Sequence, residues 1–522
     1  MRHLFVSIIL MAVCGICVAQ TPIINADVPD MSVCRVGNDY YMVSTTMHLM
    51  PGCPVMKSQD LRHWKTISYV FPRIDDAPRY SLSGDSTAYG QGQWASCIRY
   101  RDGRYYVWFT ANGAPGLGFV YTATAPEGPW TLISRPPHFH DGSLFFDDDG
   151  RVYMFYGSGQ VREMRPDLKG VLSGGLDFTI PVRDIPAEGM AADDPFAKEN
   201  GLLEGSNMIK RNGKYYLLMI SWPRGGKRRE VCYRADNIVG PYEKKVILDY
   251  ALPPFSGGVA QGTIVDTPQG EWWGIFFQDR NGIGRTPCLM PCRWEKGWPM
   301  IVPKVVDGVR QDGIIGSDDF NDASLSLYWQ WNHNPMDEAW SLTEREGFLR
   351  LTTARCVDNL FLAPNTLTQR MEGPSCQGTV CLDVVGMKDG DHCGFAAFNS
   401  DSGVLEITKE GKKHYLTMLE EKSVFDRNTH GIRSVETKQC GERIQIKNKV
   451  YLRIKADFTD GKDVATFYYS TDGVNFRRIG SDFRMGFDYL RFFMGTKFAI
   501  FNYATRKTGG HIDVDFFHYS NP

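Results

Sequence analysis

The chain contains 522 residues, of which 43% are hydrophobic and 23% charged, and its formal net charge is −2. The length predicts two or three domains, and the near-neutral charge argues against binding to nucleic acid or to an anionic membrane surface. The 53 glycines and the aromatic content of 13% favour a turn-rich β architecture.

The first residues have the pattern of a secretory signal peptide. Arg2 and His3 form a short polar start, Leu4–Val13 form an apolar core, and Ala19 offers a small residue before cleavage at Gln20. This pattern predicts that residues 1–19 are removed and that the protein is exported to the periplasm or the extracellular space. The alternative is a buried N-terminal helix. No later segment approaches the roughly 18 apolar residues of a membrane span.

A repeated pattern fills the next part of the chain: an apolar strand, a polar turn with glycine, then an aromatic strand. Its five copies are Val33–Tyr41, Ile98–Tyr106, Leu144–Tyr153, Met208–Tyr216 and Ile264–Trp273. Turns with Asp-Gly or Asn-Gly supply positive φ and close hairpins. A second hairpin follows several copies, which makes each repeat four-stranded. We therefore predict a five-bladed β-propeller over residues 20–310, a better fit to five copies than a β-sandwich.

The sequence texture changes at Ser317, where longer alternating strands begin. The predicted strands are Leu349–Leu351, Thr379–Val385, Gly394–Phe398, Val450–Phe458, Ala465–Tyr469, Tyr489–Gly495 and His511–Phe517. No amphipathic segment of helical length separates them. Residues 317–522 are therefore predicted to form a β-sandwich of jelly-roll, concanavalin-like type, which makes the whole chain all-β.

Three acidic residues stand beside apolar strands in three of the repeats. They are Asp30 in Val-Pro-Asp-Met-Ser-Val, Asp141 in His-Asp-Gly-Ser-Leu, and Glu204 in Leu-Leu-Glu-Gly-Ser. Carboxylates at matching points of successive repeats can converge on a common axis. Two carboxyl groups that face each other across a sugar are the minimum equipment for glycoside hydrolysis. The alternative for each is a carboxylate that caps backbone N–H groups at a strand end.

These segments carry a family resemblance. Residues 27–300 resemble glycoside hydrolase family 43, a family of inverting enzymes built on a five-bladed propeller. Pro29–Val33 is similar to the family's Pro-Asp-Pro-Ser-Ile element, and Asp141–Gly150 to its Asp-Pro-Ser-Leu-Phe-Phe-Asp-Asp-Asp-Gly element. Glu204–Ser206 is similar to its Glu-Gly-Pro element. Residues 318–517 resemble the β-sandwich of the family's xylosidase and arabinofuranosidase members.

The resemblance implies a role for each acid. Asp30 matches the general base, which must stay ionised and should receive hydrogen bonds. Glu204 matches the general acid, which must be protonated when substrate arrives and so needs burial or a neighbouring anion. Asp141 matches the third carboxylate, which supports the protonation and the orientation of the acid. Inversion requires base and acid to stand about 6.5–9.5 Å apart.

Four further residues are candidates for substrate binding. Trp94 occupies the family's Trp-Ala-Pro position and could stack on a sugar face, the alternative being a core aromatic. Arg285 could donate bidentate hydrogen bonds to sugar hydroxyls or lie on the surface. His48 follows the first strands and could line the pocket or be structural. Gln261 stands where many members have a histidine near a metal, so no metal is expected in the pocket and Gln261 could bind water or sugar.

Two expectations concern the second domain. No cofactor is required, but Asp319 and Asp515 could supply oxygen ligands to a structural calcium ion, although two aspartates without a spacing code are as readily ordinary surface groups. Tyr328–Pro335 is rich in aromatic and amide groups. We expect this segment to pack the sandwich on the propeller and to help wall the pocket, the alternative being a core tryptophan pair.

The residues and the resemblance together predict an exported exo-glycoside hydrolase. It would release terminal α-L-arabinofuranose, β-D-xylose or both from hemicellulose or pectin fragments, with oligosaccharide or polysaccharide as its partner. The sequence leaves both pentoses open. The alternative is a non-catalytic carbohydrate-binding protein, because Met31, Gly142 and Ser206 stand where the family often has proline.

Overall fold

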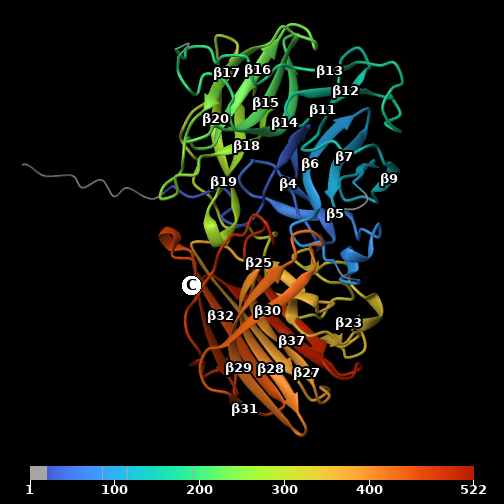
Figure 1. The fold of residues 1–522 in the computed structure, drawn as a ribbon, viewed down its shortest axis with the longest axis vertical. Helices are drawn as coiled ribbons and strands as arrows, with labels where there is room; N and C mark the ends of the chain where they lie inside the picture. The colour runs from blue at the N-terminus through green and yellow to red at the C-terminus, as the bar shows by residue number, and fades with distance from the viewer. Residues whose placement is uncertain (1–19, 85, 114–115, 192, 522) are drawn as a thin grey trace, which may run out of the picture.

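The computed structural model describes residues 20–84, 86–113, 116–191 and 193–521. They form a five-bladed β-propeller and a β-sandwich, which lie one above the other in Figure 1. The predicted fold class is thereby confirmed. The predicted signal peptide, residues 1–19, lies outside the described residues. None of the helices in the described part of the chain has the length and apolar character that crossing a membrane requires.

Each propeller blade is a four-stranded antiparallel sheet, as the sequence repeat predicts. Blade 1 contains β1 (Ser32–Val36), β2 (Asp39–Val43), β4 (Gly52–Ser58) and β5 (Lys65–Phe71). Blade 2 contains β6 (Gly92–Arg101), β7 (Arg104–Asn112), β8 (Gly118–Ala123) and β9 (Thr131–Ser134). Blade 3 contains β10 (Ser143–Phe146), β11 (Val152–Tyr156), β12 (Gln160–Met164) and β13 (Asp177–Thr179). Blade 4 contains β14 (Leu202–Arg211), β15 (Lys214–Trp222), β16 (Arg229–Ala235) and β17 (Glu243–Leu248), and blade 5 contains β18 (Ala260–Asp266), β19 (Trp272–Asp279), β20 (Arg285–Glu295) and β21 (Trp298–Ile301).

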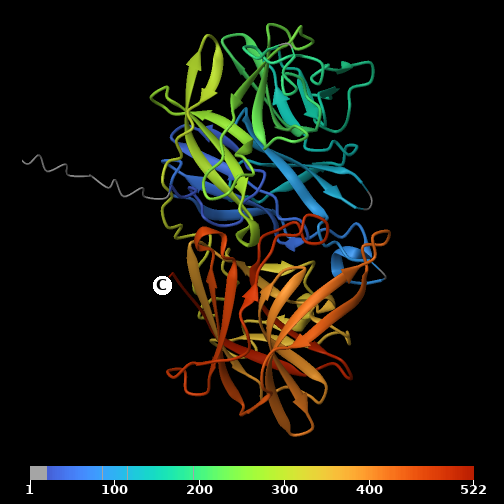
Figure 2. The ribbon, with the colours of Figure 1, turned by 60° about the vertical axis from the view of Figure 1, so that its left-hand side comes forward.

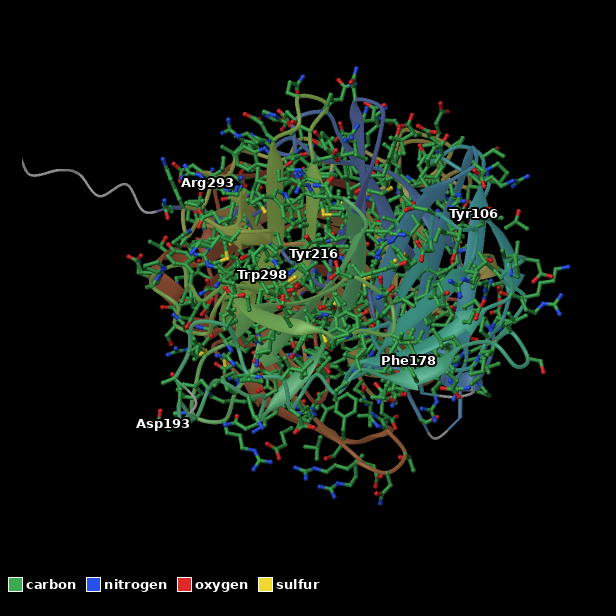
Figure 3. All side chains as sticks on the ribbon, turned by 90° about the horizontal axis from the view of Figure 1, so that it is seen from above. Tyr106, Phe178, Asp193, Tyr216, Arg293 and Trp298 are labelled. Carbon is green, nitrogen blue, oxygen red and sulfur yellow. The ribbon has the colours of Figure 1, made fainter. Side chains whose placement is uncertain are left out.

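The blades are arranged around a common axis, as the view from above shows (Figure 3). The predicted hairpin turns hold: Asp102 and Asn212 each have positive φ and precede a glycine with positive φ. Two consecutive residues of this kind match the right-handed twist of the flanking strands. The Asp-Gly and Asn-Gly dipeptides therefore set the register of the first hairpin in blades 2 and 4.

One arginine connects the blades at the axis. Arg99 donates from Nη1 to Ser32 Oγ (3.4 Å) and from Nη2 to Ser143 Oγ (2.8 Å) and Asn207 Oδ1 (2.9 Å). Asn207 Nδ2 in turn donates to the carbonyl oxygen of Gly262 (3.0 Å). These residues belong to the innermost strands of the five blades. The network connects the innermost strands of the five blades through polar contacts at the propeller axis.

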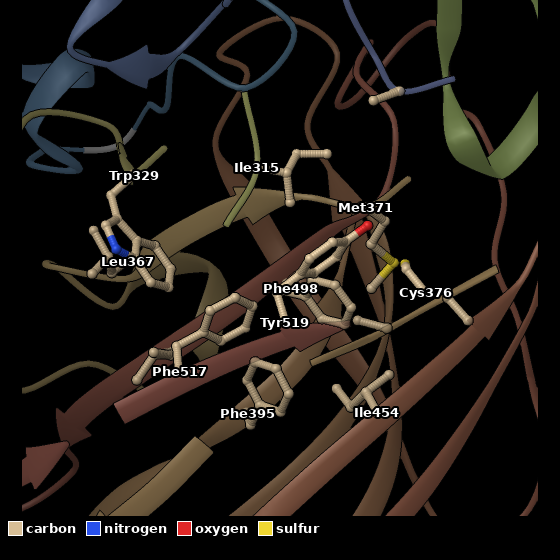
Figure 4. Close-up of a cluster of buried hydrophobic side chains, with 14 of the residues drawn as sticks. Ile315, Trp329, Leu367, Met371, Cys376, Phe395, Ile454, Phe498, Phe517 and Tyr519 are labelled. Atoms are coloured by element: carbon tan, nitrogen blue, oxygen red, sulfur yellow. The ribbon is translucent and has the colours of Figure 1, made fainter. Parts of the chain in front are cut away.

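The sandwich consists of two antiparallel sheets. One sheet has β3 (Leu49–Met50), β22 (Gln330–Asn332), β25 (Leu367–Arg370), β36 (Lys497–Ala504), β27 (Asp391–Phe398), β28 (Asp401–Glu410), β29 (Lys413–Phe425) and β30 (Ile432–Gln439) in this order, with β31 (Ile444–Ile446) beside β29. The other has β23 (Trp340–Ser341), β24 (Leu349–Thr352), β37 (His511–Ser520), β26 (Ser375–Asp383), β32 (Lys449–Asp457), β33 (Val464–Ser470) and β34 (Arg477–Arg478), with β35 (Phe483–Arg484) beside β33. Phe395, Phe498 and Phe517 meet between the sheets (Figure 4).

The helices of the described chain are single 3₁₀ turns: η1 (Pro78–Ser81), η2 (Asn281–Ile283), η3 (Asp337–Ala339), η4 (Leu360–Leu362) and η5 (Thr459–Gly461). One predicted strand is wrong, because Tyr489–Gly495 forms a loop. Asp488 Oδ1 accepts hydrogen bonds from the backbone N–H groups of Leu490 and Arg491 (both 2.8 Å), and Phe493 has φ 58°. A side chain that caps N–H groups in this way competes with strand pairing.

The sandwich packs directly on the propeller, and its loops reach the propeller face in Figure 2. The propeller strand β3 pairs with β22, so that Met50 stands opposite Trp331. Gln330 Nε2 also donates to the carbonyl oxygen of Pro51 (2.8 Å). The segment Tyr328–Pro335 therefore joins the two domains through one shared sheet, which confirms the expected packing of the sandwich on the propeller.

Candidate active site

A pocket opens where the propeller face meets the sandwich. It contains six of the seven predicted site residues. Its lining consists of Asp30, Met47, Trp94, Asp141, Leu202, Glu204, Ile220, Arg228, Gln261, Phe277, Arg285 and Phe493. The residues come from different blades and, in the case of Phe493, from one sandwich loop, so both domains line the pocket.

The innermost strand of each blade is irregular at the level of the pocket. Asp30 (φ 51°) and Asp141 (φ 48°) adopt left-handed conformations just before β1 and β10. Trp94, Glu204 and Gln261 each stand at a register shift, in β6, β14 and β18 respectively. Bulges and left-handed residues turn a side chain away from the direction that a regular strand would give it. The five blades therefore aim these side chains into one pocket instead of into the sheets.

Asp30 is held by a dense set of donors. Arg285 Nη1 donates to both carboxylate oxygens of Asp30 (2.9 and 3.0 Å), and Thr45 Oγ1 donates to Oδ2 (2.7 Å). Burial raises the pKa of Asp30 above its ordinary value, Arg285 and Thr45 lower it, and the nearby Glu204 raises it again. The ion pair with Arg285 is the interaction that favours the ionised form, which is the form a general base needs.

Arg285 is held in place by hydrogen bonds to Asp27 and Phe493. Its backbone N–H donates to Asp27 Oδ1 (2.9 Å), and its Nη2 donates to the carbonyl oxygen of Phe493 (3.3 Å). Asp27 Oδ2 accepts from Lys497 Nζ (3.1 Å) and from the backbone of Gly495 (2.8 Å). Arg285 was predicted to bind sugar hydroxyls. The structure places its guanidinium on Asp30 and ties it to three residues of the sandwich.

Asp141 and Glu204 share a histidine. His140 Nε2 lies 3.1 Å from Glu204 Oε2 and 3.9 Å from Asp141 Oδ2. The His140 ring also lies beside Trp94, with 5.8 Å between ring centroids. Asp141 is almost fully buried, whereas the side chains of Glu204 and His140 are 25% and 34% exposed. The acid-side half of the pocket is therefore a cluster of three titratable groups with access to solvent.

The protonation states of this cluster depend on one another. Burial and the charge of Glu204 raise the pKa of Asp141 to about 7, although His140 lowers it. The hydrogen bond with Glu204 raises the pKa of His140 to about 9, against the effect of burial. Groups this close release their protons as a unit. Near neutral pH Asp141 can therefore hold a proton next to the imidazolium of His140.

The prediction missed His140, whose ring contacts Glu204, and six residues of the pocket lining: Met47, Leu202, Ile220, Arg228, Phe277 and Phe493. His140 was visible in the sequence as the neighbour of Asp141, but no feature of the sequence shows that its ring turns toward Glu204. Phe493 belongs to the loop that was predicted as a strand. Its ring lies 5.5 Å from Trp94 and 4.5 Å from the Arg285 guanidinium. The sandwich thus walls the pocket with Phe493 and not with the predicted segment Tyr328–Pro335.

His48 does not reach the pocket, which corrects the expectation that it lines it. Its side chain is fully buried beneath the domain junction, where it packs against Tyr89, His333 and Phe492. Burial lowers the pKa of His48 to about 3, so the ring is neutral. His48, which was expected to bind sugar, is instead part of the apolar interface between the two domains.

Metal ligation competes with acid chemistry at this site. Among the described residues, His140, Asp141 and Glu204 are the one group of three whose potential ligand atoms lie within 4.8 Å of one another. A divalent ion would displace the proton that the acid must donate, so the cluster fits the acid role better. In the sandwich, Asp319 Oδ1 pairs with His518 (2.8 Å) and Asp515 Oδ2 with Lys449 (2.8 Å). A calcium ion at Asp319 or Asp515 stays a prediction.

Comparison with known proteins agrees with this geometry. The model of "Glycosyl hydrolases family 43" matches residues 19–299, and that of "Beta xylosidase C-terminal Concanavalin A-like domain" matches residues 317–520. A beta-xylosidase of Formosa agariphila is 27% identical to this chain over 95% of it and 89% of the relative. A non-reducing end alpha-L-arabinofuranosidase of Bacteroides ovatus is 29% identical over 77% of this chain and 76% of the relative.

A solved structure is similar along the whole chain. The bifunctional GH43-CE protein of Bacteroides eggerthii superimposes with a TM-score of 0.86 and 40% sequence identity. The match covers 97% of this chain and 64% of that protein, so this chain spans less than two thirds of it. None of these relatives supports the alternative of a non-catalytic carbohydrate-binding protein.

The cluster predicts how a histidine substitution changes the pH dependence. His140→Gln removes a positive charge that lowers the pKa of Asp141, so this pKa rises further above about 7. The cluster then keeps its proton to higher pH, and the basic limb of the kcat/KM profile should move upward by about 1 pH unit. The measurement is the pH profile of kcat/KM on an aryl glycoside.

His138→Gln is the matched control. The His138 ring stacks parallel to His140 at 6.2 Å, but burial and the neighbouring His140 lower its pKa, so it carries no charge near neutral pH. This variant should leave the basic limb in place. A basic limb that stays unchanged in His140→Gln would show that the imidazolium does not act on the carboxyl groups.

Proposed function

The chain belongs to glycosyl hydrolases family 43, and we propose that within this family it is an inverting exo-glycosidase that releases terminal pentoses. One observation carries the proposal: three blades bring Asp30, Asp141 and Glu204 into one pocket in which their environments differ. Asp30 is paired with a guanidinium, whereas Asp141 and Glu204 face each other beside an imidazole. Environments that separate two carboxyl groups in this way suit a base and an acid.

The mechanism assigns one step to each carboxyl group. Asp30, ionised beside Arg285, takes a proton from a water molecule as the water oxygen bonds to the anomeric carbon. Glu204 gives its proton to the glycosidic oxygen as that carbon–oxygen bond breaks. Asp141 stays behind the acid, where its charge and its own proton regulate the proton of Glu204. Attack opposite to the leaving group inverts the anomeric configuration.

The walls of the pocket support removal of a chain end. Trp94 and Phe493 lie edge to face on one side, and Phe277 lies under the Arg285 guanidinium on another. Aromatic faces pack against the apolar faces of a sugar ring, while the carboxylates bind its hydroxyls. Because the sandwich loop with Phe493 closes the propeller face, the pocket suits a terminal sugar better than the middle of a polymer.

Two pentoses fit the proposal. Relatives of similar identity are named beta-xylosidase and alpha-L-arabinofuranosidase. We propose hemicellulose or pectin fragments with terminal β-D-xylose or α-L-arabinofuranose as the substrate class. Rates on p-nitrophenyl β-D-xyloside and p-nitrophenyl α-L-arabinofuranoside measured side by side decide between the two sugars.

Export is also part of the proposal, because the N-terminal residues have the signal-peptide pattern. Cell fractionation with N-terminal sequencing tests it. A mature protein that begins at Gln20 in the periplasm or medium is expected, and an uncleaved protein in the cytoplasm would contradict it.

The stereochemical outcome tests the assignment of base and acid. Proton NMR of the first sugar released from the preferred aryl pentoside should show inverted anomeric configuration. Asp30→Asn should lose activity by a factor of about 10² to 10⁴, the range of general acid–base catalysis. Glu271→Gln is the control, because Glu271 is exposed in blade 5 and outside the pocket. A product of retained configuration would overturn the assignment, because retention needs a carboxylate that attacks the anomeric carbon itself.

A further inference from the structure

A second cavity, with about 30 Å³ accessible to the centre of a water molecule, lies on the propeller axis behind the substrate pocket. Its lining comes from the innermost strands of all five blades and consists of Asp30, Met31, Ser32, Ala95, Ser96, Cys97, Asp141, Gly142, Ser143, Gly205, Ser206, Asn207, Gln261 and Gly262. Asp30, Asp141 and Gln261 also line the substrate pocket. These three side chains therefore form the partition between the two spaces.

The order of residues along the strands gives the depth of this axial cavity. In β6, Trp94 lines the substrate pocket, residues 95–97 line the axial cavity, and Arg99 follows. In β14, Glu204 lines the substrate pocket and residues 205–207 line the axial cavity. Each residue of a strand advances about 3.3 Å. The axial cavity thus extends from the catalytic carboxylates down to the arginine that connects the blades.

The wall of the axial cavity contains a buried hydroxyl group that has no hydrogen-bond partner among the described residues. Ser206 is 6% exposed, and its Oγ has no hydrogen-bond partner within the part of the chain that the structure describes. Buried hydroxyl groups in proteins are almost always hydrogen-bonded, to protein or to ordered water. Ser206 faces the axial cavity two residues after the acid Glu204. Its position indicates a small hydrogen-bonding ligand in this space.

The charges at the two ends decide which ligand fits. Asp30 and Asp141 stand at the upper end, and the guanidinium of Arg99 binds the neutral side chains of Ser143 and Asn207 at the lower end. The guanidinium disfavours a cation, and the carboxylates disfavour an anion. Water is neutral, both donates and accepts, and needs about 10–15 Å³ of such accessible space per molecule. The axial cavity has room for about two such molecules.

We propose that the axial cavity binds a column of ordered water that supplies the nucleophile of the hydrolysis to Asp30. The proposal rests on the proposed function. A terminal sugar in the pocket covers the front between Trp94 and Phe493, so water reaches Asp30 from behind. In each turnover one water molecule gives its oxygen to the anomeric carbon and one proton to Asp30. Glu204 protonates the departing alcohol, and the next water of the column moves up.

Ser206→Val tests the proposal, because the added methyl groups fill the upper part of the column and remove its hydroxyl anchor. The kcat on the preferred aryl pentoside should fall at least about tenfold, part of the 10²- to 10⁴-fold effect of base catalysis. KM should stay within about twofold, because the substrate pocket is untouched and only the transition state loses an interaction. Thr110→Val is the control, since it removes another buried unpartnered hydroxyl, in β7 and away from both cavities.

A second substrate separates a water defect from an acid defect. Fluoride leaves with little help from an acid, so Glu204→Gln should retain more activity on the pentosyl fluoride than on the aryl pentoside. Ser206→Val should be impaired to the same extent on both substrates. Equal kcat values for Ser206→Val and wild type on the fluoride would overturn the proposal. If Ser206→Val does not fold, Ser206→Ala takes its place, because it removes the hydroxyl group without adding side-chain volume.

A crystal structure of the wild-type protein gives an independent answer. It should show water within hydrogen-bond distance of Ser206 Oγ, connected through further water to Asp30. An ion in the axial cavity, or water that is not connected to Asp30, would overturn the proposal. A wild-type protein that hydrolyses no pentoside would remove the proposed function, and the contents of the cavity would still be decided by this structure.

Discussion

The ion pair between Arg285 and Asp30 is the interaction on which the rest of the site depends. Both side chains are buried, and Arg285 Nη1 contacts both oxygens of the carboxylate. A buried carboxylate without a partner would take up a proton and lose its use as a base. The guanidinium opposes this, although burial still leaves the pKa of Asp30 above its ordinary value. The guanidinium must also be held in place itself. Asp27 accepts one hydrogen bond from the Arg285 backbone N–H and another from Lys497 Nζ in the sandwich.

This connection explains why the second domain is part of the catalytic unit. The propeller supplies β3 to a sheet of the sandwich, and the sandwich supplies Phe493 to the pocket and Lys497 to the network behind Arg285. Burial of Lys497 lowers its pKa to about 8, against the effect of Asp27. A charge of this kind is tolerated because it is paired across the interface. Separation of the domains would leave Lys497 without Asp27, and Asp27 without Lys497 and the backbone N–H of Gly495.

The sequence predicts the fold and much of the pocket for identifiable reasons. Repeats with Asp-Gly or Asn-Gly turns predict five blades, and acids at matching points of the repeats predict a common site. His140 could not be assigned, because its ring is placed by contacts with Glu204 and Trp94, which are distant in the sequence. Phe493 was hidden in an apolar run that resembles a strand. The predicted position of His48 in the pocket was wrong, because a local sequence pattern does not show that a residue is buried between two domains.

The most direct test of this account is the pH dependence of Arg285→Met. Arg285 lowers the pKa of Asp30, so its loss should raise this pKa, and Asp30 should stay protonated to higher pH. The acidic limb of the kcat/KM profile is then expected to move upward by about 1 pH unit or more, whereas Arg293→Met, an exposed residue of the same strand, should leave it in place. An acidic limb at the wild-type position in Arg285→Met would contradict the claim that this ion pair keeps the base ionised.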